Sequence, residues 1–157
     1  MARRVGSSLP PDLLAALSQA DLAAKIDRAF PLVTLDAKRR PHPMLCSYLE
    51  VLAVDRETIR LVINPSGQSA RNLAARRSAT IILAEPERTV YVKCRAKGKA
   101  VARGALARFT LKVREVLEDA ADPSEGDVRI TSGITYGPAP SLDDPRVRAT
   151  LDALRGD

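Results

Sequence analysis

The sequence predicts a mainly β fold of the α+β class, an antiparallel barrel of five to six strands with flanking helices. Between Phe30 and Arg103, apolar stretches of strand length alternate mostly with turn-length polar segments, which is typical of hairpins. A parallel α/β sheet would need a crossover, usually a helix, between almost every pair of successive strands, whereas this chain has one short helix between strands and otherwise hairpins. No repeat, linker or low-complexity block divides the 157 residues, so one domain over 1–157 is expected, with its barrel core at about 28–136.

The first half of the chain predicts one helix and three strands. A helix is expected over 11–28, because Pro11 suits a first helical turn and apolar residues then recur at helical spacing. Apolar, β-branched stretches predict strands over 30–36, 42–54 and 59–63. Short polar connections between them favour a three-stranded meander.

The second half predicts further strands and two longer helices. A short helix is expected over 72–77, a strand over 78–85 and the longest strand over 89–103. The longest strand alternates small apolar residues with a basic ladder, defined as Lys93, Arg95, Lys97 and Lys99. Apolar residues spaced by three and four then predict a helix over 106–120.

After a loop over 122–127, a last strand is expected over 128–137 and a terminal helix over 144–155. These two elements complete the predicted order.

Composition narrows the functions that the chain can serve. With 25 Lys and Arg against 19 Asp and Glu, the net charge is +6, which favours either an anionic partner or simply a basic surface. Aromatic residues make up only 3%, which argues against a nucleic-acid reader that stacks bases on rings. The single histidine, His42, lies between two prolines, so no Ser-His-Asp or Cys-His set can be assembled and no catalytic residue is predicted.

The two cysteines and the hydropathy pattern bear on location. Cys46 and Cys94 both lie in apolar segments without neighbouring Cys or His, so we expect buried thiols, no disulfide and no metal site. No signal-peptide pattern and no apolar stretch of about 20 residues is present. A cytoplasmic location without membrane association is therefore expected.

The segment NPSGQSARNL, residues 64–73, joins a predicted strand to a predicted helix. Free backbone N–H groups and the positive end of the helix dipole favour an anion at such a junction. The alternative is that Ser66 and Ser69 only form the turn and cap the helix.

Four segments in this order resemble the FMN-binding split β-barrel of the pyridoxamine 5'-phosphate oxidase-like superfamily over roughly residues 28–104. They are FPLVTLDAKRRPHPMLCSYLEV, IRLVIN, SGQSARNLAARRSATIILAE and VYVKCRAKGKAV. The resemblance implies a homodimer that holds FMN in a cleft between two barrels. It implies a phosphate site formed by Asn64, Ser66, Gly67, Gln68, Ser69, Arg71 and Asn72, with Cys46 and Ser47 near the ribityl chain or ring.

The chain departs from that family's pattern in the phosphate loop. Members usually carry Ser followed by Arg or Lys where this chain has Gly67, Gln68 and Ser69. The sequence therefore leaves three alternatives to FMN: a deazaflavin, haem, or no tightly bound cofactor.

Two functions follow from the resemblance and the charge. The first is a flavin-dependent oxidoreductase acting on a small-molecule substrate, in which the cofactor supplies the chemistry. Pyridoxamine phosphate is disfavoured as that substrate, because the C-terminal part of the chain does not resemble that enzyme's substrate-binding tail. The second is a non-catalytic flavin or anion carrier of the same fold, or a basic dimer that binds nucleic acid.

Overall fold

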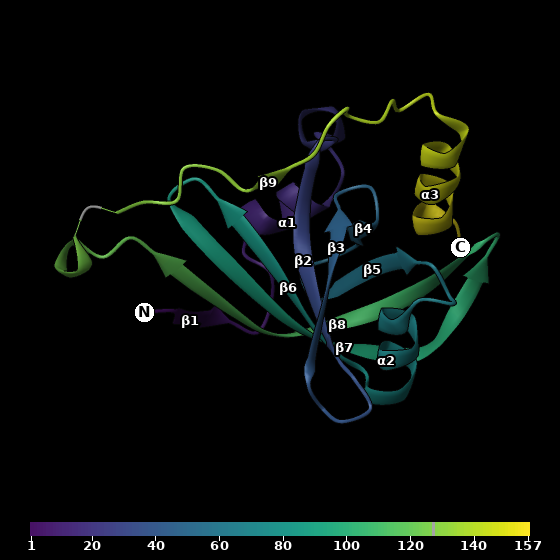
Figure 1. Ribbon diagram of the computed structural model, residues 1–157, viewed down its shortest axis with the longest axis horizontal. Coiled ribbons are helices and arrows are strands. Elements are labelled where there is room, and N and C mark those ends of the chain that lie inside the picture. Colours follow the sequence, from purple (N-terminus) through teal and green to yellow (C-terminus); the bar gives the residue numbers. More distant parts are fainter. Residues whose placement is uncertain (127) are drawn as a thin grey trace.

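A single curved antiparallel sheet forms the body of the protein in the computed structural model, which describes residues 1–126 and 128–157 (Figure 1). Its strand order is β3-β2-β6-β7-β8-β5-β4. The bounds are β2 (Arg28–Leu35), β3 (Pro41–Ser47), β4 (Val51–Ala53), β5 (Thr58–Ile63), β6 (Ser78–Glu85), β7 (Arg88–Arg103) and β8 (Leu106–Ala120). Two short strands join its margins: β1 (Arg3–Gly6) pairs with β8, and β9 (Ile134–Thr135) pairs with β2.

The two ends of this strand order are joined by only three residues of chain. β3 ends at Ser47 and β4 begins at Val51, although they occupy opposite ends of the order. Glu50 N donates to Ser47 O (3.1 Å), and Val62 N donates to Glu50 O (3.0 Å), which holds the turn against β5. The sheet therefore curls into a barrel, and the predicted fold class is confirmed.

The barrel is filled by alternate side chains of its strands, as a period of two requires. One buried cluster contains Phe30 and Leu32 of β2, Ile81 of β6 and Leu111 of β8. Because aromatics are few, the core consists mainly of Leu, Ile, Val and Ala.

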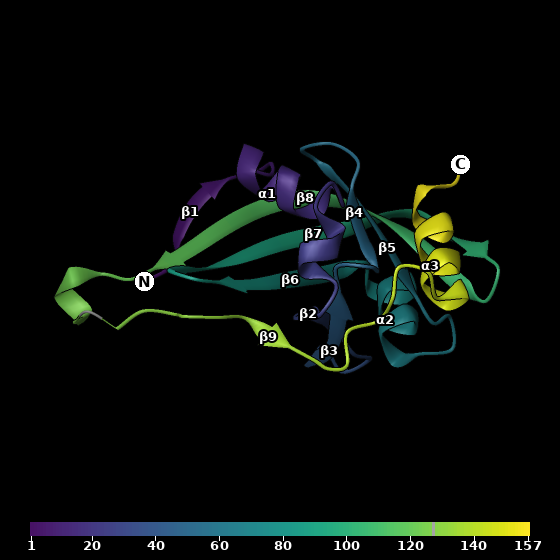
Figure 2. The same ribbon diagram turned by 90° about the horizontal axis from the view of Figure 1, so that it is seen from above.

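Three α-helices pack around the barrel (Figure 2). They are α1 (Pro11–Leu17), α2 (Gln68–Arg76) and α3 (Pro145–Arg155), with short 3-10 turns η1 (Leu22–Lys25) and η2 (Pro123–Glu125). Figure 2 shows α1 on one side of the long strands, whereas β3, β9 and α2 lie on the other. α3 packs Val147 and Leu151 into the main core, and its Leu154 meets Val62 of β5.

The prediction of a helix over 106–120 is wrong, because these residues form β8. Alternate residues Phe109, Leu111 and Val113 are buried, as in any strand. A bulge then breaks the pairing with β7, since Cys94 opposes Val113 while its neighbour Lys93 opposes Glu115. The extra residue moves the next buried position to Val116, and the spacing of three across the bulge imitated a helix.

The other element boundaries shift for local reasons. The strand expected over 42–54 is divided into β3 and β4. Its two expected antiparallel pairings are present as the β2–β3 and β4–β5 hairpins, but the break between β3 and β4 means that they do not form one continuous meander. The helix expected over 11–28 ends at Leu17, two residues before Gln19, whose φ of 64° is left-handed.

Several smaller differences concern the elements near the candidate site and the C-terminus. The short helix begins at Gln68 rather than at Asn72. Of the strand expected over 128–137, only Ile134–Thr135 is paired, and Asp127 of the expected loop lies outside the described residues. With these changes the sheet has nine strands among the described residues, rather than five or six.

Candidate functional site

The loop between β5 and α2 is shaped by its own hydrogen bonds. The side-chain oxygen Oδ1 of Asn64 accepts from Ser66 N (2.9 Å) and from Ser66 Oγ (2.8 Å), and Gly67 N donates to Asn64 O (3.1 Å). This Asx turn satisfies the groups of the loop and leaves Asn64 and Ser66 exposed.

α2 begins without a side-chain cap. Gly67 occupies the N-cap position, and no side chain accepts a hydrogen bond there from the first turn. The backbone N–H groups at a helix start have no partner inside the helix, so an uncapped start can receive an external acceptor. The expectation that Ser66 or Ser69 caps the helix is therefore wrong.

Arg71 lies across this helix start. Its guanidinium donates from Nη1 to Ser66 O (2.5 Å) and from Nη2 to Gln68 Oε1 (2.9 Å). Arg71 is exposed, so it holds the loop in shape while its positive charge stays accessible beside the α2 start.

Asn72 and Ser69 face inward from the same turn. Asn72 is 3% exposed, accepts from Gln68 Nε2 (2.8 Å) and donates from Nδ2 to Thr34 Oγ1 (2.9 Å). Thr34 Oγ1 in turn donates to His42 O (3.3 Å), so the chain of bonds ties α2 to β2 and β3. In this structure Asn72 is a structural link, and its predicted contact with a cofactor stays a prediction.

The other two predicted residues lie at the end of β3. Cys46 is 2% exposed, and burial raises the pKa of its thiol far above the usual value. Cys94 is also buried and free, so the expectation of two buried thiols without a disulfide is confirmed. Ser47 donates to Glu50 Oε2 from its backbone N (2.6 Å) and from Oγ (3.1 Å).

Cys46 and Ser47 line a pocket of about 620 Å³ that the loop residues do not reach. Its remaining lining comes from β2, from β3, from the turn over 48–50, and from the C-terminal part of the chain: Ala29, Leu45, Leu49, Glu50, Ile134, Thr135, Tyr136, Pro140, Asp144, Arg146, Val147 and Thr150. The nine predicted residues thus form two groups, seven at the α2 start and two at this pocket.

Sequence reasoning missed Glu50 and the α3 residues of this pocket. A lone carboxylate between Leu49 and Val51, inside an apolar segment, was the one available signal for Glu50. The sequence carried no signal for the α3 residues, because they reach the pocket only through the tertiary fold.

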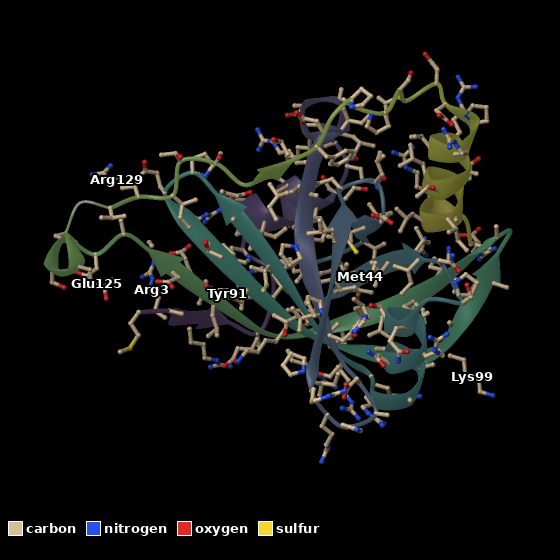
Figure 3. All side chains as sticks on the ribbon, in the orientation of Figure 1. Arg3, Met44, Tyr91, Lys99, Glu125 and Arg129 are labelled. Atoms are coloured by element: carbon tan, nitrogen blue, oxygen red, sulfur yellow. The ribbon has the colours of Figure 1, made fainter. Side chains whose placement is uncertain are left out.

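The basic ladder is split by the structure. All four residues are exposed, and Lys93 Nζ also pairs with Glu115 Oε2 at 2.8 Å. Lys99 lies near the far end of the β7–β8 hairpin, away from Arg3 at the opposite end of the molecule (Figure 3). Arg95 also lines a pocket of about 560 Å³ with Leu35, Ala37, Arg39, Ala75, Arg76 and Ser78.

Within residues 1–126 and 128–157, no group of three or more His, Cys, Asp or Glu is placed to hold a metal ion. In the same part of the chain, no helix has the length and apolar character needed to span a bilayer.

No protein-family model matches the chain, and no curated protein matches it in sequence. Solved structures do share its fold. A candidate pyridoxamine 5'-phosphate oxidase from Lactobacillus delbrueckii has a TM-score of 0.58 at 13% identity, over 73% of this chain and 98% of that one. An FMN-binding protein from Syntrophomonas wolfei has a TM-score of 0.55 at 12% identity, over 71% and 88% of the two chains.

A heme binding protein from Mycobacterium smegmatis has a TM-score of 0.50 at 15% identity, over 73% of this chain and 59% of that one. Proteins that share this barrel therefore differ in the ligand for which they are named.

Proposed function

We propose that this chain, which has the split-barrel fold of the pyridoxamine 5'-phosphate oxidase-like proteins, binds FMN and acts as a flavin-dependent oxidoreductase on a small molecule. FMN would supply hydride or electron transfer, and the protein would bind and orient it. The structural likeness supports the fold, whereas the cofactor is inferred from the α2 start.

The uncapped start of α2 carries the proposal. Gly67 leaves the first-turn N–H groups open, and Arg71 adds a positive charge beside them. Backbone N–H groups at a helix start together with a guanidinium form a donor set that suits a phosphate. Ser66, Gln68 and Arg71 would hold the phosphate, so the departures at 67–69 leave a site that still fits.

The outer surface of β3 is suited to the flat part of the cofactor. Leu45 is 60% exposed and Pro43 is exposed, so this edge strand offers an apolar surface on the side of the sheet where α2 lies (Figure 2). The buried side chain of Cys46 would not contact the ring, and that strand would interact through Leu45, Ser47 and its backbone.

A homodimer and a cytoplasmic location belong to the same proposal. Leu45 and Val101, the latter 46% exposed, are large apolar side chains that a second copy would cover. The two free thiols favour a reducing compartment. Light scattering on the purified protein checks the dimer, and a monomer at micromolar concentration would contradict it.

The cofactor proposal is tested by titrating FMN and following the quenching of its fluorescence. We expect Arg71→Ala to weaken binding about tenfold or more, because it removes the one charge at the α2 start. Arg95→Ala is the matched control, since Arg95 is also exposed but lies on β7, and we expect a change of less than about twofold. Equal losses in both variants would rule out the α2 start as the phosphate site.

A basic nucleic-acid-binding protein is the second candidate function. Its support is the pocket of about 560 Å³, which has three arginines and no carboxylate in its lining. Binding of a labelled DNA or RNA oligonucleotide should then weaken steeply as salt rises and should fall in Arg39→Ala and Arg95→Ala. Flavin binding should change little with salt, so binding measurements over one series of salt concentrations distinguish the two candidate functions.

A further inference from the structure

The pocket at the end of β3 has the size and lining of a small-molecule site. Its volume is about 620 Å³, within the range of roughly 300–1,000 Å³ that is common for ligand pockets. Most of its wall is apolar, formed by Ala29, Leu45, Leu49, Ile134, Pro140 and Val147. The C-terminal segment covers one side, because Tyr136 N donates to Asp27 O (2.9 Å) and Tyr136 Oη donates to Ile26 O (2.9 Å).

Glu50 places a carboxylate in this apolar wall, and only one of its two oxygens accepts a hydrogen bond from the residues that the structure describes. Its Oε2 accepts both hydrogen bonds from Ser47, at 2.6 Å and 3.1 Å. Among the described residues, none donates a hydrogen bond to Oε1, and no Lys or Arg forms an ion pair with Glu50. A half-buried carboxylate without a cation is costly to keep in a folded protein, and such groups gather at binding sites.

The other charges of the pocket do not balance Glu50. Arg146 is paired with Asp144, through Nη2 and Oδ2 at 3.1 Å, so its charge is compensated within the α3 start. Burial raises the pKa of Glu50, and burial also raises the pKa of the nearby Tyr136 hydroxyl, with Glu50 and Asp27 adding to the latter effect. The pocket therefore has one uncompensated acidic group.

We propose that this pocket binds a small apolar molecule that carries a protonated amine, with the ammonium on Glu50 Oε1 and the apolar part against Leu49 and Val147. An ammonium supplies both a donor and the missing positive charge. An alcohol supplies only a donor, and a carboxylate would be repelled. The pocket shares Leu45 and Ser47 with the β3 surface proposed for the flavin ring, but the ammonium contact rests on Glu50, and no residue of the α2 start lines the pocket.

The test uses three matched probes: phenethylamine, phenethyl alcohol and phenylacetate. Each is titrated into the full chain at neutral pH, and binding is followed by NMR shifts of the protein. We expect the amine to bind about tenfold more tightly than the alcohol, because a hydrogen bond to a charged partner is stronger than a neutral one, and phenylacetate to bind most weakly.

Two variants and one control locate the site. Glu50→Gln should weaken the amine about tenfold and leave the alcohol within about twofold, since it removes the charge and keeps the shape. Thr150→Phe narrows the pocket and should weaken both probes. Glu125→Gln is the control, because Glu125 is exposed at the far end of the molecule (Figure 3).

Phenylacetate binding as tightly as the amine, an unchanged amine affinity in Glu50→Gln, or no binding of any probe would overturn the proposal. If Glu50→Gln does not fold, the order of the three probes on the unmodified chain and their loss in Thr150→Phe still decide it. The flavin proposal is decided separately by the FMN titration, which none of these variants enters.

Discussion

Replacing Asn72 with alanine should loosen the connection between α2 and the β2–β3 hairpin. The substitution removes two side-chain hydrogen bonds, one from Gln68 Nε2 and one to Thr34 Oγ1, at 2.8 Å and 2.9 Å. The second is fully buried, because Thr34 is 1% and Asn72 3% exposed. At about 1 kcal/mol for each bond, with a further cost for leaving buried polar groups unpaired, we expect a loss of about 2–3 kcal/mol.

For a chain of this length, that loss corresponds to a fall in Tm of roughly 4–12 °C. Thermal unfolding followed by circular dichroism gives Tm, and urea unfolding gives the free energy directly. Gln68→Ala is the matched control, since it keeps the buried bond to Thr34 and removes only the bonds of the exposed Gln68 with Asn72 and Arg71, so it should cost less than about 1 kcal/mol.

If Asn72→Ala unfolds within about 0.5 kcal/mol of the unmodified chain, the reasoning fails and the bond to Thr34 contributes nothing. If the bond does position α2, FMN affinity should fall in the same variant even at temperatures where it is folded. A variant that loses stability and keeps full FMN affinity would separate the structural role from the site.

Three further predictions concern a buried carboxylate, a paired arginine and the two buried thiols. Burial raises the pKa of the Glu50 carboxyl above 4.5, so the folded state binds the carboxyl proton more tightly than the unfolded state does and loses stability as the pH rises past 4.5. Glu50→Gln should therefore have a higher Tm than the unmodified chain at pH about 8, and this difference should vanish near pH 4. Arg88→Gln should cost about 1 kcal/mol at neutral pH, because Arg88 donates to Asp12 and Glu118 at 2.5 Å and 3.1 Å. The hydrogen bond from Arg88 lowers the pKa of Asp12, and bonds from Arg3 and then Arg88 lower that of Glu118, so this cost should shrink as pH falls below about 4 in urea unfolding curves. A thiol reagent should find no reactive cysteine in the native protein and two after denaturation, because both thiols are buried.

Local patterns were enough to predict much of the barrel. The alternation along β7 gave its strand correctly, and its two faces as far as Lys97, where the register shifts. The order of segments resembled the split-barrel fold that the solved structures share. The failure at β8 has a physical cause, because the bulge between Val113 and Glu115 changes the parity of the buried face and no local pattern marks it. Likewise, the break between β3 and β4 is imposed by closure of the barrel, which is a tertiary event.

In the candidate site, too, local features could be predicted from the sequence and contacts between distant residues could not. The α2 start is formed by consecutive residues, so a turn followed by a helix could be anticipated from the sequence, although the helix begins at Gln68, four residues before the predicted start. The pocket of Glu50 could not, because Tyr136 and Arg146 reach it from about 90 residues further along the chain. Sequence alone gives no means of bringing such residues together unless the fold is already known.

The three-residue link over 48–50 bears on how the barrel assembles. The β2–β3 and β4–β5 hairpins each connect neighbours in the chain, so both can form before any distant pairing. They are already tethered to each other when β5 meets β8, a pairing that joins Thr58 to Lys112. Closing the ring therefore adds little loop entropy, and the slow step of folding should be the docking of β6, β7 and β8, which lie in the strand order between two hairpins that the chain already tethers to each other.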